Sequence, residues 1–276
     1  YIWRDEPPAS GSPADIDASF GGSAWSRDSQ SGDYYFHLFA PQQTDLNWAN
    51  SDLRTEVYAM MNWWLDKGVA GFRMDVIDII GKRPEDGIVA DGPELHSYLR
   101  EMQEATLAGR DAVTVGEAWS ATPVNAPLYS APERREVSMV FQFDHVTQFW
   151  DDKLGKWKPK PIDWPKLKAT FTTWQQALHN NGWNSLFWGN HDLPRAVSRY
   201  GDEGEYRVAS AKALATALHL MQGTPYIFQG EEIGMTNAGF TRIDQYRDIE
   251  TLNFHRIQLA EGVNEAAFLA GARANS

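Results

Sequence analysis

Hydrophobic residues recur at helical spacing in four stretches of the chain. The first stretch begins after Asn50 or Ser51, either of which is a suitable N-terminal cap, and Gly68 can end it. In the second, Pro93 stands in the first turn of a helix expected over residues 93–108. Residues three or four apart share one face of a helix, so each stretch predicts an amphipathic helix. The apolar positions are Leu53, Val57, Met60, Met61 and Trp64, then Leu95, Leu99 and Met102, then Leu167, Phe171, Trp174 and Leu178, and finally Val208, Ala211, Leu214, Ala215 and Leu218.

Five short apolar and aromatic runs alternate with these helices, as buried strands do. Such alternation predicts parallel βα units, in either an open doubly wound sheet or a closed (β/α)8 barrel. Five strands are too few for a complete barrel, but no glycine-rich phosphate loop follows any of them, so the open nucleotide-binding type lacks its main signal. The runs are residues 71–77, 112–119, 138–143, 184–190 and 224–230.

Two parts of the chain are irregular in pattern. Residues 1–48 are rich in Gly, Ser, Asp and Pro, and their apolar run at 34–39 predicts one or two short strands. Residues 150–165 read as a long surface loop.

Composition excludes several classes of partner. The 37 acidic against 25 basic residues give a net charge of -12, and no basic stripe is present that could bind nucleic acid or an anionic membrane. No apolar run approaches the roughly 18 residues that a membrane-spanning helix needs. The chain has no cysteine, which rules out disulfides and fits a reducing compartment such as the cytoplasm.

Charged residues gather where three of the predicted strands end. The first strand ends in Arg73 and Asp75, the second in Glu117, and the fourth in His191 and Asp192. In an α/β barrel, catalytic groups come from the C-terminal ends of several strands. Three carboxylates at one rim fit metal binding or acid/base chemistry on a glycosidic bond. Taken singly, a strand-end aspartate is more often a helix cap and a histidine more often a satisfied core residue.

Arg73 and Asp75 lie two residues apart inside an otherwise apolar run. On a strand both side chains point to the same face, so we expect a buried pair in which the guanidinium keeps Asp75 ionised.

Three motifs resemble blocks of glycoside hydrolase family 13, the alpha-amylase family. They are GFRMDVI, TVGEAW and FWGNHDLPR. The segments FGGSAW, TDLNWAN, MVFQFDH, GWNSLFW and GTPYIFQGEEIGMTN are similar to the oligo-1,6-glucosidase and dextran-glucosidase branch. The resemblance covers nearly the whole chain and implies a (β/α)8 barrel enzyme.

The resemblance also implies roles for single residues. Asp75 would be the nucleophile, Glu117 the general acid/base, and Asp192 the carboxylate that binds sugar hydroxyls and stabilises the transition state. Arg73 and His191 would hold the nucleophile and the innermost sugar. The implied mechanism is double displacement with retention, which requires the two reacting carboxyls to lie about 5 to 5.5 Å apart.

Further positions are implied to contact substrate. Val76, directly after the nucleophile, resembles enzymes that favour α-1,6 bonds, so isomaltooligosaccharides are the expected substrate, with maltooligosaccharides or sucrose as alternatives. Trp119 fits a stacking wall for the leaving sugar, and Glu250 fits a polar contact there. Phe143 and Arg195 lie within two of the matching segments. No cofactor is expected, since the family's metal-binding loop would lie N-terminal to this chain.

Departures from the family pattern predict an incomplete barrel. The family's third-strand Asp and Asn-His pair is missing, and residues 273–276 lack the aspartate and core arginine expected after the eighth strand. We therefore expect residues 1–48 to be the end of an inserted domain and residues 49–276 to be a partial catalytic barrel, about strands four to eight.

Three other readings stay open. A sucrose isomerase or transglucosylase would share all three carboxylates. The ancillary subunits of amino-acid transporters have this fold without activity, although here the three acids are intact. The third reading is a protein that only binds carbohydrate.

Overall fold

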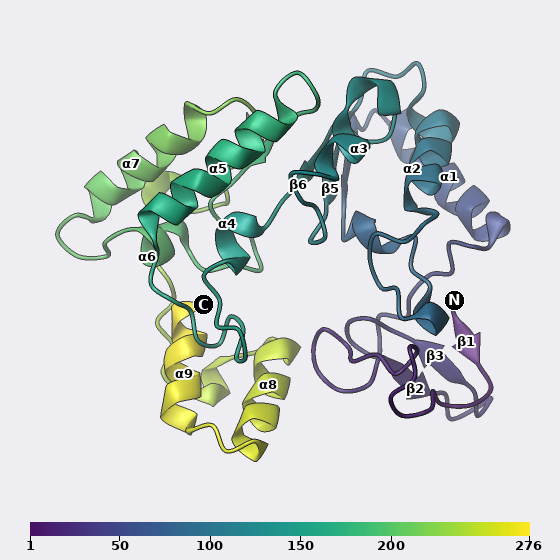
Figure 1. Ribbon diagram of the computed structural model, residues 1–276, viewed down its shortest axis with the longest axis horizontal. Coiled ribbons are helices and arrows are strands. Elements are labelled where there is room, and N and C mark those ends of the chain that lie inside the picture. The colour runs from purple at the N-terminus through teal and green to yellow at the C-terminus, as the bar shows by residue number, and fades with distance from the viewer. The chain divides into compact units, whose positions relative to one another are not determined.

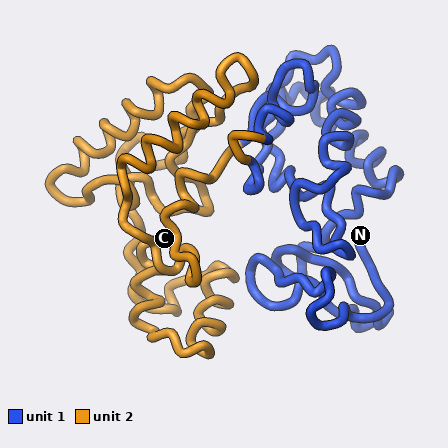
Figure 2. Tube along the Cα trace, viewed as in Figure 1, with its two compact units in different colours: residues 1–121, 125–140 blue, residues 122–124, 141–276 orange.

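The structure is a computed structural model that describes residues 1–276, and it divides into two compact units (Figure 2). The first unit comprises residues 1–121 and 125–140, and the second comprises residues 122–124 and 141–276. The boundary predicted between residues 48 and 49 lies inside the first unit. Each unit is described by itself.

A small antiparallel sheet opens the first unit. It contains three strands, β1 (Trp3–Arg4), β2 (Trp25–Arg27) and β3 (Tyr34–Phe36), in the order β1-β3-β2. The sequence predicted one or two. Trp25 lies opposite Phe36 in the β2–β3 pair and packs against it, and its indole N–H donates to the backbone oxygen of Ala14 at 2.9 Å. The hydrogen bond satisfies the only polar atom of this buried ring.

The second sheet contains a parallel strand pair, as predicted. Strands β4 (Gly71–Met74) and β5 (Val113–Glu117) pair in parallel, and β6 (Met139–Phe141) completes the order β4-β5-β6. Gly71 has a φ of 150° opposite Val113, where an added Cβ would meet the Val113 backbone oxygen at 1.8 Å. Only glycine fits this close approach of two strands.

Two helices lie side by side next to these strands (Figure 1). In α1 (Ser51–Asp66), the Asn50 side chain caps the first turn, as predicted. Tyr58, Met61 and Leu65 form its buried face, whereas Met60 and Trp64, predicted to face the core, are exposed. Helix α2 (Leu95–Met102) buries its predicted face and continues into a π-helical turn (Gln103–Leu107). A short helix, α3 (Ala126–Ser130), follows β5.

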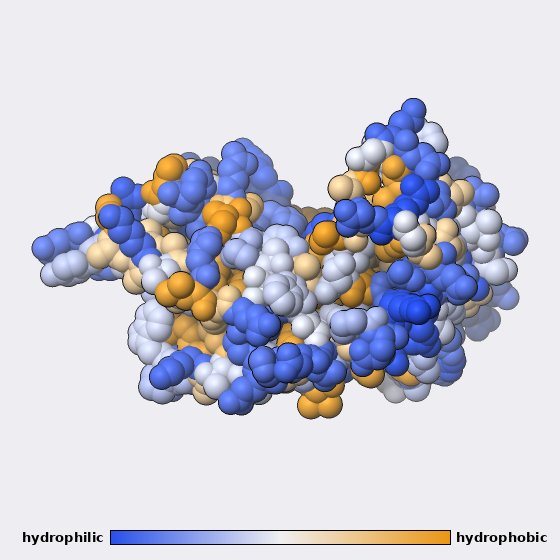
Figure 3. Space-filling view, turned by 90° about the horizontal axis from the view of Figure 1, so that it is seen from above, coloured by the Kyte–Doolittle hydropathy of each residue, from blue (hydrophilic) through white to orange (hydrophobic).

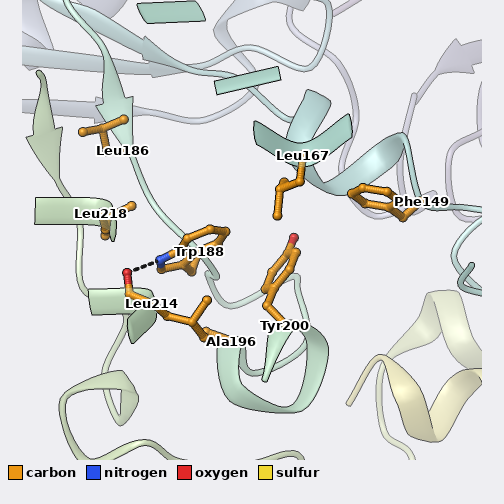
Figure 4. Packing of buried hydrophobic residues seen from close by; sticks show 8 residues of the cluster. All are labelled: Phe149, Leu167, Leu186, Trp188, Ala196, Tyr200, Leu214 and Leu218. Atoms are coloured by element: carbon orange, nitrogen blue, oxygen red, sulfur yellow. Dashed lines mark hydrogen bonds between the residues drawn. The ribbon is translucent and has the colours of Figure 1, made fainter. Parts of the chain in front are cut away.

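The second unit has its core between two predicted helices, α5 (Trp164–Leu178) and α7 (Arg207–His219). Strands β7 (Ser185–Leu186) and β8 (Thr224–Pro225) pair in parallel. Figure 4 shows Trp188 in this core, where its indole N–H donates to the Leu214 backbone oxygen at 2.8 Å.

Helices α8 (Ile249–Ala260) and α9 (Glu265–Ala274) were not predicted, nor were the short α4 (Asp144–Thr147) and α6 (Ala196–Tyr200). The segment 150–165 is irregular, as expected, but it is not only a surface loop. Its Trp157 is buried against Phe268 of α9. The 3₁₀ turns are Ile77–Ile79, Pro84–Asp86, Pro132–Arg134, Glu231–Ile233 and Ile243–Gln245.

The surface mixes hydrophilic and apolar side chains (Figure 3). Among the helices, none combines the length and the hydropathy that crossing a bilayer requires.

Candidate active site

The register of β4 and β5 brings two carboxylates to one end of the sheet. Arg73 lies opposite Val115 and Met74 opposite Gly116, so Asp75 and Glu117 follow at neighbouring positions. The Arg73 guanidinium donates to Asp75 Oδ1 with one nitrogen and to Glu117 Oε2, at 2.8 Å, with the other. One planar cation thus contacts both acids and orients them relative to each other.

The expectation of two buried charges at Arg73 and Asp75 is wrong. The Asp75 side chain is 76% exposed and the Arg73 side chain is 35% exposed. Strand β4 ends at Met74, so Asp75 extends past the packed part of the sheet. Of the two acids, Glu117 is the buried one, and its side chain is 3% exposed.

Opposing effects act on the Glu117 carboxyl. Burial raises its pKa above the ordinary value of 4.5, and the neighbouring Asp75 acts in the same direction. Hydrogen bonds from the Trp119 indole N–H (2.9 Å) and the Val76 backbone N–H (3.2 Å), together with the Arg73 charge, act against the rise. A raised carboxyl pKa suits a general acid at neutral pH.

Val76 adopts a strained backbone conformation. Its φ of 34° and ψ of 49° are left-handed, which is rare for a β-branched residue. Strain of this kind costs roughly 1–3 kcal/mol and persists where the surroundings enforce it. Here the conformation aims the Val76 N–H at Glu117.

Trp119 lies beside the same carboxyl. The residue is 38% exposed while its indole N–H is bonded to Glu117 Oε1. An exposed ring face next to a buried acid is a suitable surface for a sugar to stack on. The predicted stacking role stays a prediction.

The fourth-strand residues lie in the second unit. His191 Nε2 and Asp192 Oδ2 are 3.3 Å apart and both side chains are exposed to solvent. The Asn190 side chain accepts the Asp192 backbone N–H at 2.8 Å. Arg195 stacks over the Phe228 ring at 4.7 Å and bonds to the Gln229 backbone oxygen.

Two other residues that were predicted to contact substrate, Phe143 and Glu250, have partners within the protein. Phe143 is 2% exposed and packs against Phe187 in a hydrophobic cluster. Its placement gives no support to a substrate contact. Glu250, in the first turn of α8, forms an ion pair with Lys156.

Sequence reasoning missed a buried carboxylate near the site. Asp78 is 1% exposed, and burial raises its pKa. The available signal was a second aspartate three residues after Asp75, inside the same apolar run.

No three His, Asp or Glu side chains gather as they would around a metal ion. The prediction that no cofactor is needed is untested by this finding.

Comparisons with known proteins agree on one family. The model of the family described as "Alpha amylase, catalytic domain" matches residues 1–268. A palatinase of Erwinia rhapontici is 57% identical over all of this chain and 50% of its own length. A glucan 1,6-alpha-glucosidase of Streptococcus pneumoniae is 55% identical over 95% of this chain and 48% of its own length. An oligo-1,6-glucosidase of Bacillus cereus is 50% identical over 95% and 49%.

Solved structures give the same result. An isomaltulose synthase of Erwinia rhapontici in complex with sucrose superimposes with a TM-score of 0.93 at 35% identity, covering 100% of this chain and 52% of the other. A trehalose-6-phosphate hydrolase of Bacillus licheniformis has a TM-score of 0.90 at 45% identity, covering 100% and 51%. The chain thus spans about half the length of the relatives it matches.

Proposed function

The chain belongs to the alpha-amylase catalytic-domain family, and from that membership we propose that it provides the catalytic carboxylates of a retaining α-glucoside hydrolase. The substrate class is α-1,6-linked glucooligosaccharides, with α-1,4-linked chains as poorer substrates. Residues 1–48 are assigned to the end of an inserted domain and residues 49–276 to about strands four to eight of a (β/α)8 barrel.

The observation that carries the proposal is the Arg73 guanidinium bonded to both Asp75 and Glu117. A single guanidinium reaches two carboxylates only when they are close together. Asp75 also lies close enough to Glu117 to raise its pKa, and together these contacts support the separation of about 5 to 5.5 Å needed for retention more than the roughly 6.5 to 9.5 Å needed for inversion.

The difference between the two environments supports the division of roles. Asp75 is exposed and bonded to Arg73, so its carboxyl group is oriented and accessible to a sugar. Burial raises the pKa of Glu117, which favours the protonated form that a general acid needs. Asp75 would attack the anomeric carbon while Glu117 protonates the leaving oxygen. Glu117 would then deprotonate the water that releases the sugar.

Asp192 is proposed as the third carboxylate, which binds sugar hydroxyls, with His191 beside it. Val76 supports the α-1,6 preference through its resemblance to enzymes of that specificity. The names of the relatives, which include glucan 1,6-alpha-glucosidase and oligo-1,6-glucosidase, support the same choice.

The experiment measures glucose release from isomaltose and from maltose by the protein encoded by the complete reading frame. We expect a higher kcat/KM on isomaltose, and an equal or reversed ratio would contradict the linkage preference. Asp75→Asn should lower kcat by a factor of at least about 1,000, because no nucleophile remains, and leave sugar binding measurable. Asp66→Asn, the same change at an exposed position of α1, is the matched control and should retain activity.

A second candidate, sucrose isomerisation, is favoured by one observation, the likeness to an isomaltulose synthase bound to sucrose. Product analysis on sucrose separates the two functions. Isomaltulose or trehalulose as the main product would support isomerisation, and free glucose and fructose would support hydrolysis.

A further inference from the structure

A buried hydrogen bond joins the two segments that follow Asp75 and Glu117. Asp78 lies in the 3₁₀ turn three residues after Asp75, and its Oδ2 atom accepts the backbone N–H of Ser120 at 2.8 Å. Ser120 itself lies three residues after Glu117. The other oxygen of Asp78, Oδ1, is buried without a hydrogen-bond partner. Burial raises the pKa of Asp78, and hydrogen bonds from Ser120 and from the backbone of its own turn act against the rise, so the carboxylate is only partly compensated.

The bond spans the two segments that carry the donors to Glu117. Val76, two residues before Asp78, donates its N–H to Oε2, and Trp119, directly before Ser120, donates its indole N–H to Oε1. The two oxygens of one carboxylate are therefore held from opposite segments. A shift of either segment would lengthen one of these bonds, and the Asp78 bond prevents that shift.

The segment after Asp78 has little freedom to compensate. The Asp91 N–H donates to the Asp78 backbone oxygen at 2.9 Å, and the Asp91 carboxylate accepts the Tyr129 hydroxyl at 3.1 Å. At Gly92, an added Cβ would meet the backbone oxygen of Gly81 at 1.9 Å. Such close backbone packing makes the segment a rigid support for the site.

We propose that Asp78 is a positioning residue that fixes, through the Ser120 N–H, the alignment in which Val76 and Trp119 both donate to Glu117. This inference rests on the proposed function, because it concerns the general acid of that reaction. The Asp78 carboxylate bonds to the Ser120 backbone, so it would act through the donors to Glu117. The charged groups that face Glu117 within its own unit are Arg73 and Asp75.

Loss of the link has a measurable consequence in two quantities. The donors stabilise the ionised form of Glu117, so weakening them raises the pKa of Glu117. The free enzyme needs this group protonated, so the basic limb of the kcat/KM profile moves to higher pH. The misaligned acid lowers kcat by roughly 10- to 100-fold with KM nearly unchanged.

The test compares variants of the protein from the complete reading frame. Asp78→Ala removes the acceptor. Asp78→Asn keeps an oxygen that can accept the Ser120 N–H, and its amide nitrogen takes the place of the second oxygen. Its kcat and pH profile should therefore match those of the parent and not those of Asp78→Ala. Leu99→Ala is the control for stability alone, since this buried leucine of α2 lies on no segment of the link. It should lower the melting temperature without moving the pH profile.

Each outcome decides one question. If the parent protein is active and Asp75→Asn inactivates it, the proposed function is upheld. This result does not depend on how the Asp78 variants behave. The inference is overturned if Asp78→Ala keeps the parent kcat and basic limb at a temperature where it is folded, or if Asp78→Asn is as defective as Asp78→Ala. Should Asp78→Ala fail to fold, Asp78→Ser takes its place, since its hydroxyl is too short to reach Ser120.

Discussion

Glu117 is the residue at which stability and chemistry are in conflict. The carboxyl is buried, and burial raises its pKa above 4.5, so the folded state holds its proton more tightly than the unfolded state does. By linkage, the stability that Glu117 contributes is fully present below about pH 4.5 and is lost as the pH rises through the folded-state pKa. Above its folded-state pKa the ionised group destabilises the fold on which its function depends.

Glu117→Gln should therefore be more stable than the parent at pH 7 although it loses activity. The amide does not titrate, so the gain should shrink as the pH falls and vanish near pH 4. Urea unfolding at both pH values measures this difference in the free energy of unfolding. Glu261→Gln, at an exposed position, should show no such dependence. An equal gain at both pH values would mean that packing, not ionisation, is responsible.

The sequence predicts these site residues only in part. The strand-end rule identifies Arg73, Asp75 and Glu117, because parallel strands bring their carboxyl ends to one edge. It does not reveal which acid is buried, since burial depends on where β4 ends. The left-handed backbone of Val76 has no sequence signal, because valine is among the residues least suited to it.

Among the elements, α8 and α9 show why periodicity failed. The buried residues of α8 are Thr251 and Gln258, while Ile249 and Leu252 are exposed. The hydrophobic pattern of this helix therefore does not mark the face that is buried. In α1 the spacing predicted a helix correctly but assigned Met60 and Trp64 to the wrong side. Periodicity detects a helix, whereas the elements that pack against the helix decide which of its apolar residues are buried.

Helix α9 offers a prediction against the usual rule for glycine. Gly→Ala inside a helix normally stabilises it by about 1 kcal/mol. At Gly271, however, the new Cβ would lie 1.6 Å from the backbone oxygen of Trp157. Both chain segments must then separate, so we expect Gly271→Ala to lower the free energy of unfolding by at least about 2 kcal/mol.

Thermal and urea unfolding measure this loss. Gly204→Ala is the control, because its Cβ would approach only the Asp202 side chain, at 3.4 Å. A Gly271→Ala protein as stable as the control would show that the 150–165 segment does not pack tightly on α9.

At the scale of the molecule, the chain holds its strands in small separate sheets. Strand β4 pairs with β5 alone and leaves its other edge open, and β7 and β8 form a two-stranded sheet. The alternation of helices and strands predicted this parallel α/β organisation. It could not predict the division into two units, because that depends on contacts far apart in sequence.

Open edges and uncovered side chains lead to the last prediction. On α1, Met60, Trp63 and Trp64 are 45–53% exposed, a contiguous apolar surface on one helix. Exposed strand edges and apolar surfaces promote association between molecules. We therefore expect the 276-residue chain, produced alone, to bind a hydrophobic dye and aggregate on warming, and the protein from the complete reading frame to do neither.

Light scattering during a temperature ramp tests this expectation, and charged substitutions locate its cause. Met60→Lys with Trp64→Lys should delay aggregation of the 276-residue chain, because like charges on the exposed face repel. If further parts of the protein cover that face, the same pair should destabilise the complete protein by burying unpaired charges. Equal thermal behaviour of the two proteins, with no effect of the lysines on either, would show that α1 is a solvent-facing helix in both.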